Sequence, residues 1–83
     1  MTKKIMYFTA KWCGPCQSFR PIVQQVIKEG ADIIMIDADS SNGLVERLGV
    51  SSIPSILVVD QNYNVEKRHS GVMTKEQLKN FIV

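Results

Sequence analysis

Cysteine, histidine and long apolar runs are scarce in this sequence, and each scarcity excludes a class of protein. The 83 residues include two cysteines and one histidine, whereas a structural zinc site usually takes four Cys or His ligands. No apolar run approaches the roughly 18 residues of a membrane-spanning helix. The run Ile5–Phe8 near the N-terminus is too short for the apolar region of a signal peptide, which spans about 7–15 residues. We therefore expect a cytoplasmic protein that has no membrane partner.

Concentrated charge is also missing. Ten Lys and Arg residues stand against eight Asp and Glu residues, for a net charge of +2, and no basic run exceeds two residues. A nucleic-acid-binding protein would need a basic patch or stripe, so we expect no nucleic-acid partner. Hydrophobic residues make up 45% of the chain, as in ordinary globular proteins. The length predicts one domain over residues 1–83, and we expect a monomer.

The first half of the chain alternates between strand and helix patterns. Residues 5–9 are apolar and aromatic, which predicts a buried strand. After Pro15 the apolar residues recur with the spacing of one helix face, at Phe19, Ile22, Val23, Val26 and Ile27. Pro21 lies inside this predicted helix and should kink it, and Gly30 predicts its C-terminal end. The continuous apolar run Ile33–Ile36 predicts a strand that helices cover on both faces.

The second half adds a short helix, two strands and a last helix. Ser40–Asn42 can cap the short helix that follows them. Ile56–Val59 predicts another buried strand, and the polar segment Val65–Ser70 predicts an edge strand. Thr74 begins the last helix, with Gln77 at the capping-box position. The predicted order is β-α-β-α-β-β-α, an α/β fold around one sheet.

The two cysteines, Cys13 and Cys16, lie where the first predicted strand meets the first predicted helix. A helix N-terminus stabilises an anion through its free N–H groups and its dipole, and the thiolate is the reactive form of cysteine. Cys13 should therefore have a lowered pKa and act as a nucleophile. Cys16, one helical turn later, comes within bonding range and can resolve a mixed disulfide. Gly14 permits the tight turn, and Pro15 suits an early helical position.

Three other uses of the cysteine pair are possible. Attachment of c-type haem needs a histidine where this chain has Gln17. A zinc or iron–sulfur site would need a second copy of the chain, because His69 is the one further His or Cys ligand. A purely structural bridge would close too short a loop to restrain the unfolded chain much. A redox couple is the favoured interpretation, with a shared metal site as the competing one.

The stretch Trp12-Cys13-Gly14-Pro15-Cys16 resembles the signature of the thioredoxin family. Pro21 matches the proline in that family's active-site helix. Ser52–Ser55 resembles the family's cis-proline loop, and Gly71–Leu78 resembles the glycine segment before its last helix. The resemblance implies a trimmed thioredoxin fold of glutaredoxin size, without the usual N-terminal strand and helix. Its four-stranded mixed sheet would have the order 2-1-3-4, with helices on both faces.

The resemblance also implies a function and a set of site residues. The protein would reduce protein disulfides by dithiol exchange, with Cys13 attacking, Cys16 resolving and a redox-active disulfide in place of a bound cofactor. A thioredoxin-reductase-type flavoprotein, or another dithiol system, would restore the dithiol. The Ile53–Pro54 bond would be cis, and the Ile53 backbone would pair with an extended substrate. The apolar rim around Cys13 would consist of Trp12, Pro15, Ile53, Gly71 and Val72.

Two positions depart from the family pattern. Many thioredoxins carry a buried acid six residues before the first cysteine, and this acid helps to deprotonate the resolving cysteine. Tyr7 stands there, and Ile33 replaces the lysine that often accompanies the acid. We expect Tyr7 to be a core aromatic, although its hydroxyl or a water could take over the acid's role.

Two alternative functions stay open at this stage. A glutathione-dependent, glutaredoxin-like reductase is disfavoured, because the chain has Gly14-Pro15 between its cysteines and no Asp after Gly71. A thioredoxin-fold binding module with incidental redox activity is the other alternative.

Overall fold

The computed structural model describes residues 3–83, so the first two residues of the predicted domain lie outside it. The elements follow the predicted order, with one additional 3-10 turn. They are β1 (Lys4–Thr9), α1 (Gly14–Lys28), β2 (Ile33–Asp37), the 3-10 turn η1 (Ala38–Ser40), α2 (Asn42–Arg47), β3 (Ser55–Val59), β4 (Val65–Ser70) and α3 (Lys75–Phe81). In this part of the chain, no helix is both long enough and apolar enough to cross a membrane.

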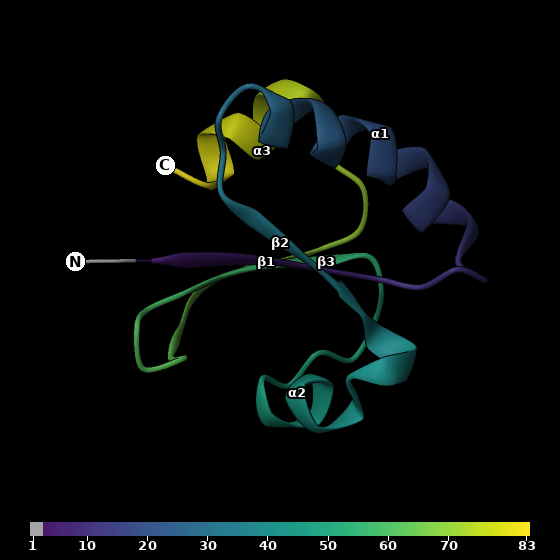
Figure 1. Cartoon of the computed structure of the whole chain (residues 1–83), viewed down its shortest axis with the longest axis vertical. Coiled ribbons are helices and arrows are strands. Elements are labelled where there is room, and N and C mark those ends of the chain that lie inside the picture. Colours follow the sequence, from purple (N-terminus) through teal and green to yellow (C-terminus); the bar gives the residue numbers. More distant parts are fainter. Residues whose placement is uncertain (1–2) are drawn as a thin grey trace.

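The four strands form one mixed sheet in the order β2-β1-β3-β4. β1 runs parallel to β2 and antiparallel to β3, and β4 runs antiparallel to β3. Helices α1 and α3 cover one face, while α2 lies against the other (Figure 1). The predicted fold is therefore confirmed. Because β1 and β2 are parallel, their carboxyl ends meet at one edge, where Thr9 pairs with Asp37.

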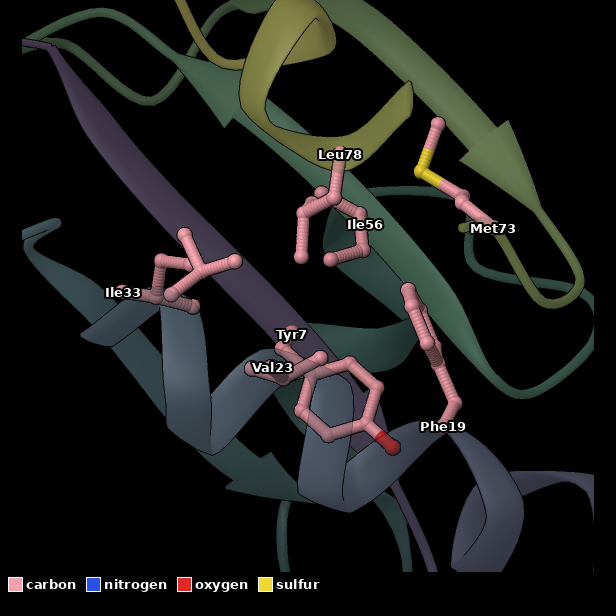
Figure 2. Packing of buried hydrophobic residues seen from close by; sticks show 8 residues of the cluster. Tyr7, Phe19, Val23, Ile33, Ile56, Met73 and Leu78 are labelled. Atoms are coloured by element: carbon pink, nitrogen blue, oxygen red, sulfur yellow. The ribbon is translucent and has the colours of Figure 1, made fainter. Parts of the chain in front are cut away.

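Two hydrophobic cores lie on opposite faces of the sheet. The larger, which we call the α1–α3 core, packs the ring of Tyr7 edge-on against Phe19 and includes Leu78 from α3 (Figure 2). The smaller, the α2 core, joins Leu57 of the sheet to Leu48 beyond the end of α2. β3 is buried along its whole length because it contributes to both cores.

The ends of the helices show which of the predicted start and stop signals are present in the structure. Pro21 lies inside α1, which ends at Lys28 and is followed by Gly30 with φ +113°, a conformation that favours glycine. The predicted capping box at Thr74 is present, with reciprocal hydrogen bonds to Gln77. The predicted side-chain cap of α2 is wrong: Ser41 occupies the N-cap position but forms no side-chain capping bond within the described chain. Asp37 instead caps η1, which leads directly into α2.

The prediction that helices cover Ile33–Ile36 on both faces is confirmed for Ile33 and Ile36 but wrong for Ile34 and Met35. β2 is an edge strand, and Ile34 and Met35 are 44% and 36% exposed. Ile33 and Ile36 are buried, since each packs into one of the two cores. A continuous apolar run therefore indicated a strand but not its place in the sheet, because the number of neighbouring strands is set by the whole topology.

Candidate active site

Cys13 and Cys16 form a disulfide at the start of α1, with their Cα atoms 5.2 Å apart. Cys13 is the N-cap residue of the helix, and its Sγ accepts a hydrogen bond from the backbone N–H of Cys16 at 3.2 Å. The backbone N–H of Cys13 in turn binds the Ala10 carbonyl, which closes the turn after β1. The helix N-terminus thus directs a backbone donor at the first sulfur, as anion stabilisation requires.

The two sulfur-bearing residues differ in their access to solvent. Cys16 is fully buried, whereas Cys13 is 4% exposed and lies at the rim of the site. Both pack with Ala10, and the half-buried Ile53 covers them from the loop before β3. Cys13 is thus slightly more accessible than Cys16.

The loop before β3 brings a second segment to the disulfide. The Ile53–Pro54 peptide bond is cis, and Pro54 is buried. The Ile53 carbonyl oxygen lies 3.9 Å from Cys13 Sγ. The Pro54 carbonyl accepts a hydrogen bond from the Gly71 N–H at 2.9 Å. Residues far apart in the sequence therefore meet around Cys13, as the family resemblance implied.

The rim of the site is apolar and largely exposed. Trp12 is 69% exposed, and Pro15 and Val72 are also exposed, whereas Gly71 is partly buried. Gly71 has φ +100°, which favours glycine. Met73, two residues on, turns into the α1–α3 core instead. The side chains predicted to contact a substrate thus lie on segments that adjoin the disulfide or the Pro54 loop.

Asp39 is a further residue of the site, and no sequence motif marks it. The indole N–H of Trp12 donates a hydrogen bond to Asp39 Oδ2 at 2.7 Å. Asp39 lies in η1, which follows β2, and the pairing of Thr9 with Asp37 brings this turn beside the end of β1. An Asp in a turn is ordinary by itself, so the parallel pairing of β1 and β2 was the signal that could have revealed the contact.

A groove of about 320 Å³ extends from Trp12 toward α2. Its walls are mostly apolar and include two serines. The lining residues are Trp12, Ala38, Val45, Val50, Ser51, Ser52 and Ile53. Trp12 and Ile53 flank both the groove and the disulfide, so the groove opens beside Cys13.

Comparison with known proteins identifies the family. The sequence matches the family model described as Thioredoxin over residues 2–83. This chain belongs to the thioredoxin family. It is 33% identical to a thioredoxin of Haemophilus influenzae over 81 residues, which cover 94% of this chain and 75% of that protein. It is 35% identical to a thioredoxin of Bacillus subtilis over 78 residues, which cover 90% of this chain and 74% of that one.

Solved thioredoxin structures have the same fold. The Drosophila melanogaster thioredoxin Deadhead superposes with a TM-score of 0.82 at 28% identity, covering 95% of this chain and 76% of that chain. Oxidised mitochondrial thioredoxin 3 from Saccharomyces cerevisiae gives a TM-score of 0.80 at 23% identity, with coverages of 96% and 76%. Together with the Cys13–Cys16 pair, family membership confirms that this thioredoxin is a thiol-disulfide oxidoreductase.

The family's buried acid is replaced in this thioredoxin by a hydrogen-bonded tyrosine. Tyr7 is fully buried, which confirms the core aromatic, and its hydroxyl donates to the Cys16 carbonyl oxygen at 3.2 Å. Ile33, at the position that the family resemblance assigns to the accompanying lysine, lies in the same α1–α3 core. The side chains at these two positions bring no carboxylate or ammonium group to Cys16.

Three ionisable groups away from the disulfide have lowered pKa values because they accept hydrogen bonds. Hydrogen bonds from Lys75 and Lys79 lower the pKa of Glu29, next to the end of α1. Hydrogen bonds from Asn64 lower the pKa of Asp60 in the turn before β4. A hydrogen bond from Lys4 lowers the pKa of Tyr63.

The metal-site alternative gains no support within a single chain. Among residues 3–83, no three His, Cys, Asp or Glu side chains cluster as a metal site would require. His69 packs edge-on against Phe81 at 6.1 Å between ring centroids, and is therefore partly covered by α3.

Proposed function

We propose that this thioredoxin is a monomeric, cytoplasmic reductase of protein disulfides, built as a single domain over residues 1–83 and working without a bound cofactor. One observation carries the proposal: Cys13 lies at the rim and accepts the Cys16 N–H, whereas Cys16 is fully buried beneath it. Both cysteines are buried, but only Cys13 Sγ accepts a hydrogen bond from the helix N-terminus, and this difference suits two different steps of one exchange reaction.

In the first step, the Cys13 thiolate attacks one sulfur of a substrate disulfide. The substrate S–S bond breaks, a mixed disulfide forms, and the departing substrate sulfur takes up a proton. The N–H of Cys16 and the dipole of α1 stabilise the attacking thiolate. Cys13 is thus the catalytic nucleophile.

In the second step, the Cys16 thiolate attacks the Cys13 sulfur of the mixed disulfide. The bond to the substrate breaks, the second substrate thiol leaves, and the Cys13–Cys16 disulfide forms. Two electrons have then passed from this chain to the substrate. Gly14 and Pro15 support this step by holding the two cysteines within one helical turn.

The substrate side of the site consists of Trp12, Ile53, Pro54, Gly71 and Val72. An extended substrate strand can bind along the Ile53 backbone, since its carbonyl lies beside Cys13 Sγ. The groove between Trp12 and α2 is wide enough for an apolar side chain that flanks the substrate cysteine. Regeneration of the dithiol requires an electron donor, for which we propose a thioredoxin-reductase-type flavoprotein.

Reduction of insulin with dithiothreitol as the electron source tests the activity. We expect insulin to precipitate faster with the protein than with dithiothreitol alone, and a variant in which both cysteines are serine to fall to the background rate. A background rate for the unmodified protein would rule out the reductase. A partner complex that survives the double replacement would instead favour the binding module.

Trapping tests the roles of the two cysteines. A Cys16→Ser variant should accumulate mixed disulfides with protein substrates, because the second step is blocked while the first is intact. A Cys13→Ser variant should trap far less, because the remaining thiol is buried. Equal trapping by the two variants, read on non-reducing gels, would contradict the assignment.

A further inference from the structure

The two edges of the sheet are protected to different degrees. β4, at one edge, carries three charged residues in succession, Glu66, Lys67 and Arg68. β2, at the other edge, has an uncharged apolar run from Ile33 to Ile36. Natural proteins protect edge strands with charge, bulges or covering segments, because an open edge can pair with another chain. Among the described residues, β4 carries charge along its middle, whereas β2 carries charge only at its end, at Asp37.

The basic side chains of β4 also bind backbone carbonyls of neighbouring segments. Lys67 Nζ donates to the carbonyl oxygens of Phe81 and Val83 at 3.1 and 3.0 Å. The Arg68 guanidinium donates to the carbonyls of Leu48 and Gly49 at 2.9 and 3.0 Å.

The pairing of β3 with β4 also shifts register between Val58 and Val59, which interrupts the regular ladder of backbone hydrogen bonds. The β4 edge is therefore unsuited to a further strand.

The β2 edge exposes apolar surface on both faces of the sheet. Ile34 and Met35 point to opposite faces, because neighbouring side chains alternate along a strand, and both are exposed. A strand laid along this edge would cover both side chains and bind the backbone groups that β1 leaves free. The edge is thus an interaction surface for an extended segment.

The two acidic residues that flank the apolar run of β2 indicate what kind of segment can pair with this edge. Asp32 and Asp37 lie immediately before and at the end of the apolar run, five positions apart. In the antiparallel pairing that aligns all four apolar residues of two copies, Ile34 faces Met35, and Asp32 of each copy faces Asp37 of the other. Like charges in directly opposed positions destabilise a strand pair. A second copy is therefore a poor occupant.

We propose that the β2 edge binds, by strand addition, an extended segment of another protein that carries two basic residues five positions apart with apolar or β-branched residues between them. Its two basic residues would face Asp32 and Asp37, and its apolar side chains would cover Ile34 and Met35. This surface is separate from the disulfide chemistry and does not rest on it.

The test uses the peptide acetyl-KVTIVK-amide and backbone NMR of the whole protein. We expect saturable chemical-shift changes, and slower amide exchange, concentrated on residues 33–37. The peptide acetyl-EVTIVE-amide should bind at least tenfold more weakly, and a backbone N-methylated KVTIVK peptide should not bind. Equal binding of the Lys and Glu peptides, or changes centred on β4, would overturn the proposal.

Variants of the protein sharpen the test. The double variant Asp32→Asn with Asp37→Asn should weaken KVTIVK binding about fivefold to tenfold, while the Asn at position 37 keeps an oxygen that can cap η1. Met35→Lys, which places a charge on the edge, should also weaken binding. Glu76→Gln, on α3, is the matched control and should leave binding unchanged. A dimer of the peptide-free protein with β2 amides protected would assign the edge to a second copy and refute the proposal.

Discussion

At the scale of single residues, Tyr7 is the unusual feature of the site. It stands where many thioredoxins place a buried acid, and it satisfies its own hydroxyl by donating to the Cys16 carbonyl. Its ring fills the α1–α3 core against Phe19 (Figure 2). Tyr7 thus packs in the core through its ring and binds the backbone of Cys16 through its hydroxyl.

Replacing Tyr7 by Phe should lower stability modestly. The ring stays, but the carbonyl of Cys16 loses a buried hydrogen bond, which contributes about 0.5–1.5 kcal/mol. Urea denaturation of the oxidised protein measures the change. Tyr63→Phe is the matched control, because its hydroxyl bond to Lys4 is near the surface and should matter less. A larger loss from Tyr63→Phe than from Tyr7→Phe would contradict this.

Replacing Asp39 by Ala should impair substrate binding more than chemistry. The Asp39 carboxylate orients the Trp12 indole, and loss of one such bond, worth about 1 kcal/mol, predicts a KM for insulin about threefold to tenfold higher. The value of kcat should change less than about twofold, because the cysteines are untouched. Asp39→Asn keeps an acceptor oxygen and should lie between the two proteins. A fall in kcat with an unchanged KM would argue against a positioning role.

The sequence motif predicted the residues to which we assign the chemistry, but not the contact of Asp39 with Trp12. Cys13, Cys16, Trp12 and Pro54 lie in short stretches whose chemistry is readable locally. The bond between Trp12 and Asp39 joins residues 27 positions apart. It depends on the pairing of β1 with β2, which no local pattern encodes.

At the scale of elements, one carboxylate links the end of α1 to α3. Glu29 accepts hydrogen bonds from Lys75 and Lys79, which lower the pKa of Glu29 below its ordinary value near 4.5. These two helices together cover one face of the sheet (Figure 1). The link therefore supports the helical layer that carries the cysteines.

Glu29→Gln should destabilise the protein at neutral pH but not in acid. A carboxyl whose pKa is lowered by folding adds stability above its unfolded pKa, and this contribution disappears as the pH falls through the folded pKa. The difference between Glu29→Gln and the unmodified protein should thus be present at pH 7 and vanish at strongly acidic pH. Thermal unfolding at several pH values measures it. Glu46→Gln, on α2, is the control, and an equal pH dependence there would refute the link.

The helices and strands were predicted correctly, but the number of neighbours of a strand and one helix cap were not. β2 and β3 have equally apolar sequences, yet β3 has a strand on each side and β2 has one. The Thr74 cap was correct because all its partners lie within one helical turn. The cap at Ser41 was wrong because η1 precedes α2 and changes how the chain enters it.

At the scale of the whole molecule, one sheet separates two cores and should join them into one cooperative unit. β3 contributes Ile56 to the α1–α3 core and Leu57 to the α2 core. A substitution that destabilises either core should therefore also destabilise β3, which both cores share. The order of strands and helices was predictable from the alternation of patterns, and the order of the strands in the sheet followed from the family resemblance.

Leu57→Ala and Leu78→Ala should each lower the free energy of unfolding by about 2–5 kcal/mol, because each leaves a cavity at a fully buried site. Although they lie in different cores, both should preserve a single transition. Circular dichroism and the fluorescence of Trp12, the lone tryptophan, should report the same midpoint. Separate midpoints for the two signals would show that the cores unfold independently.

The unequal edges of the sheet also limit how far an assembly can grow. A fibre needs each molecule to offer two complementary open surfaces, so that every addition exposes a site for the next. Here the charged β4 edge is unsuited to pairing with a further strand, and only the β2 edge has an apolar run that a strand from another chain can cover. A strand bound at β2 therefore ends in a complex of defined stoichiometry, and this thioredoxin can keep an apolar edge without polymerising through its sheet.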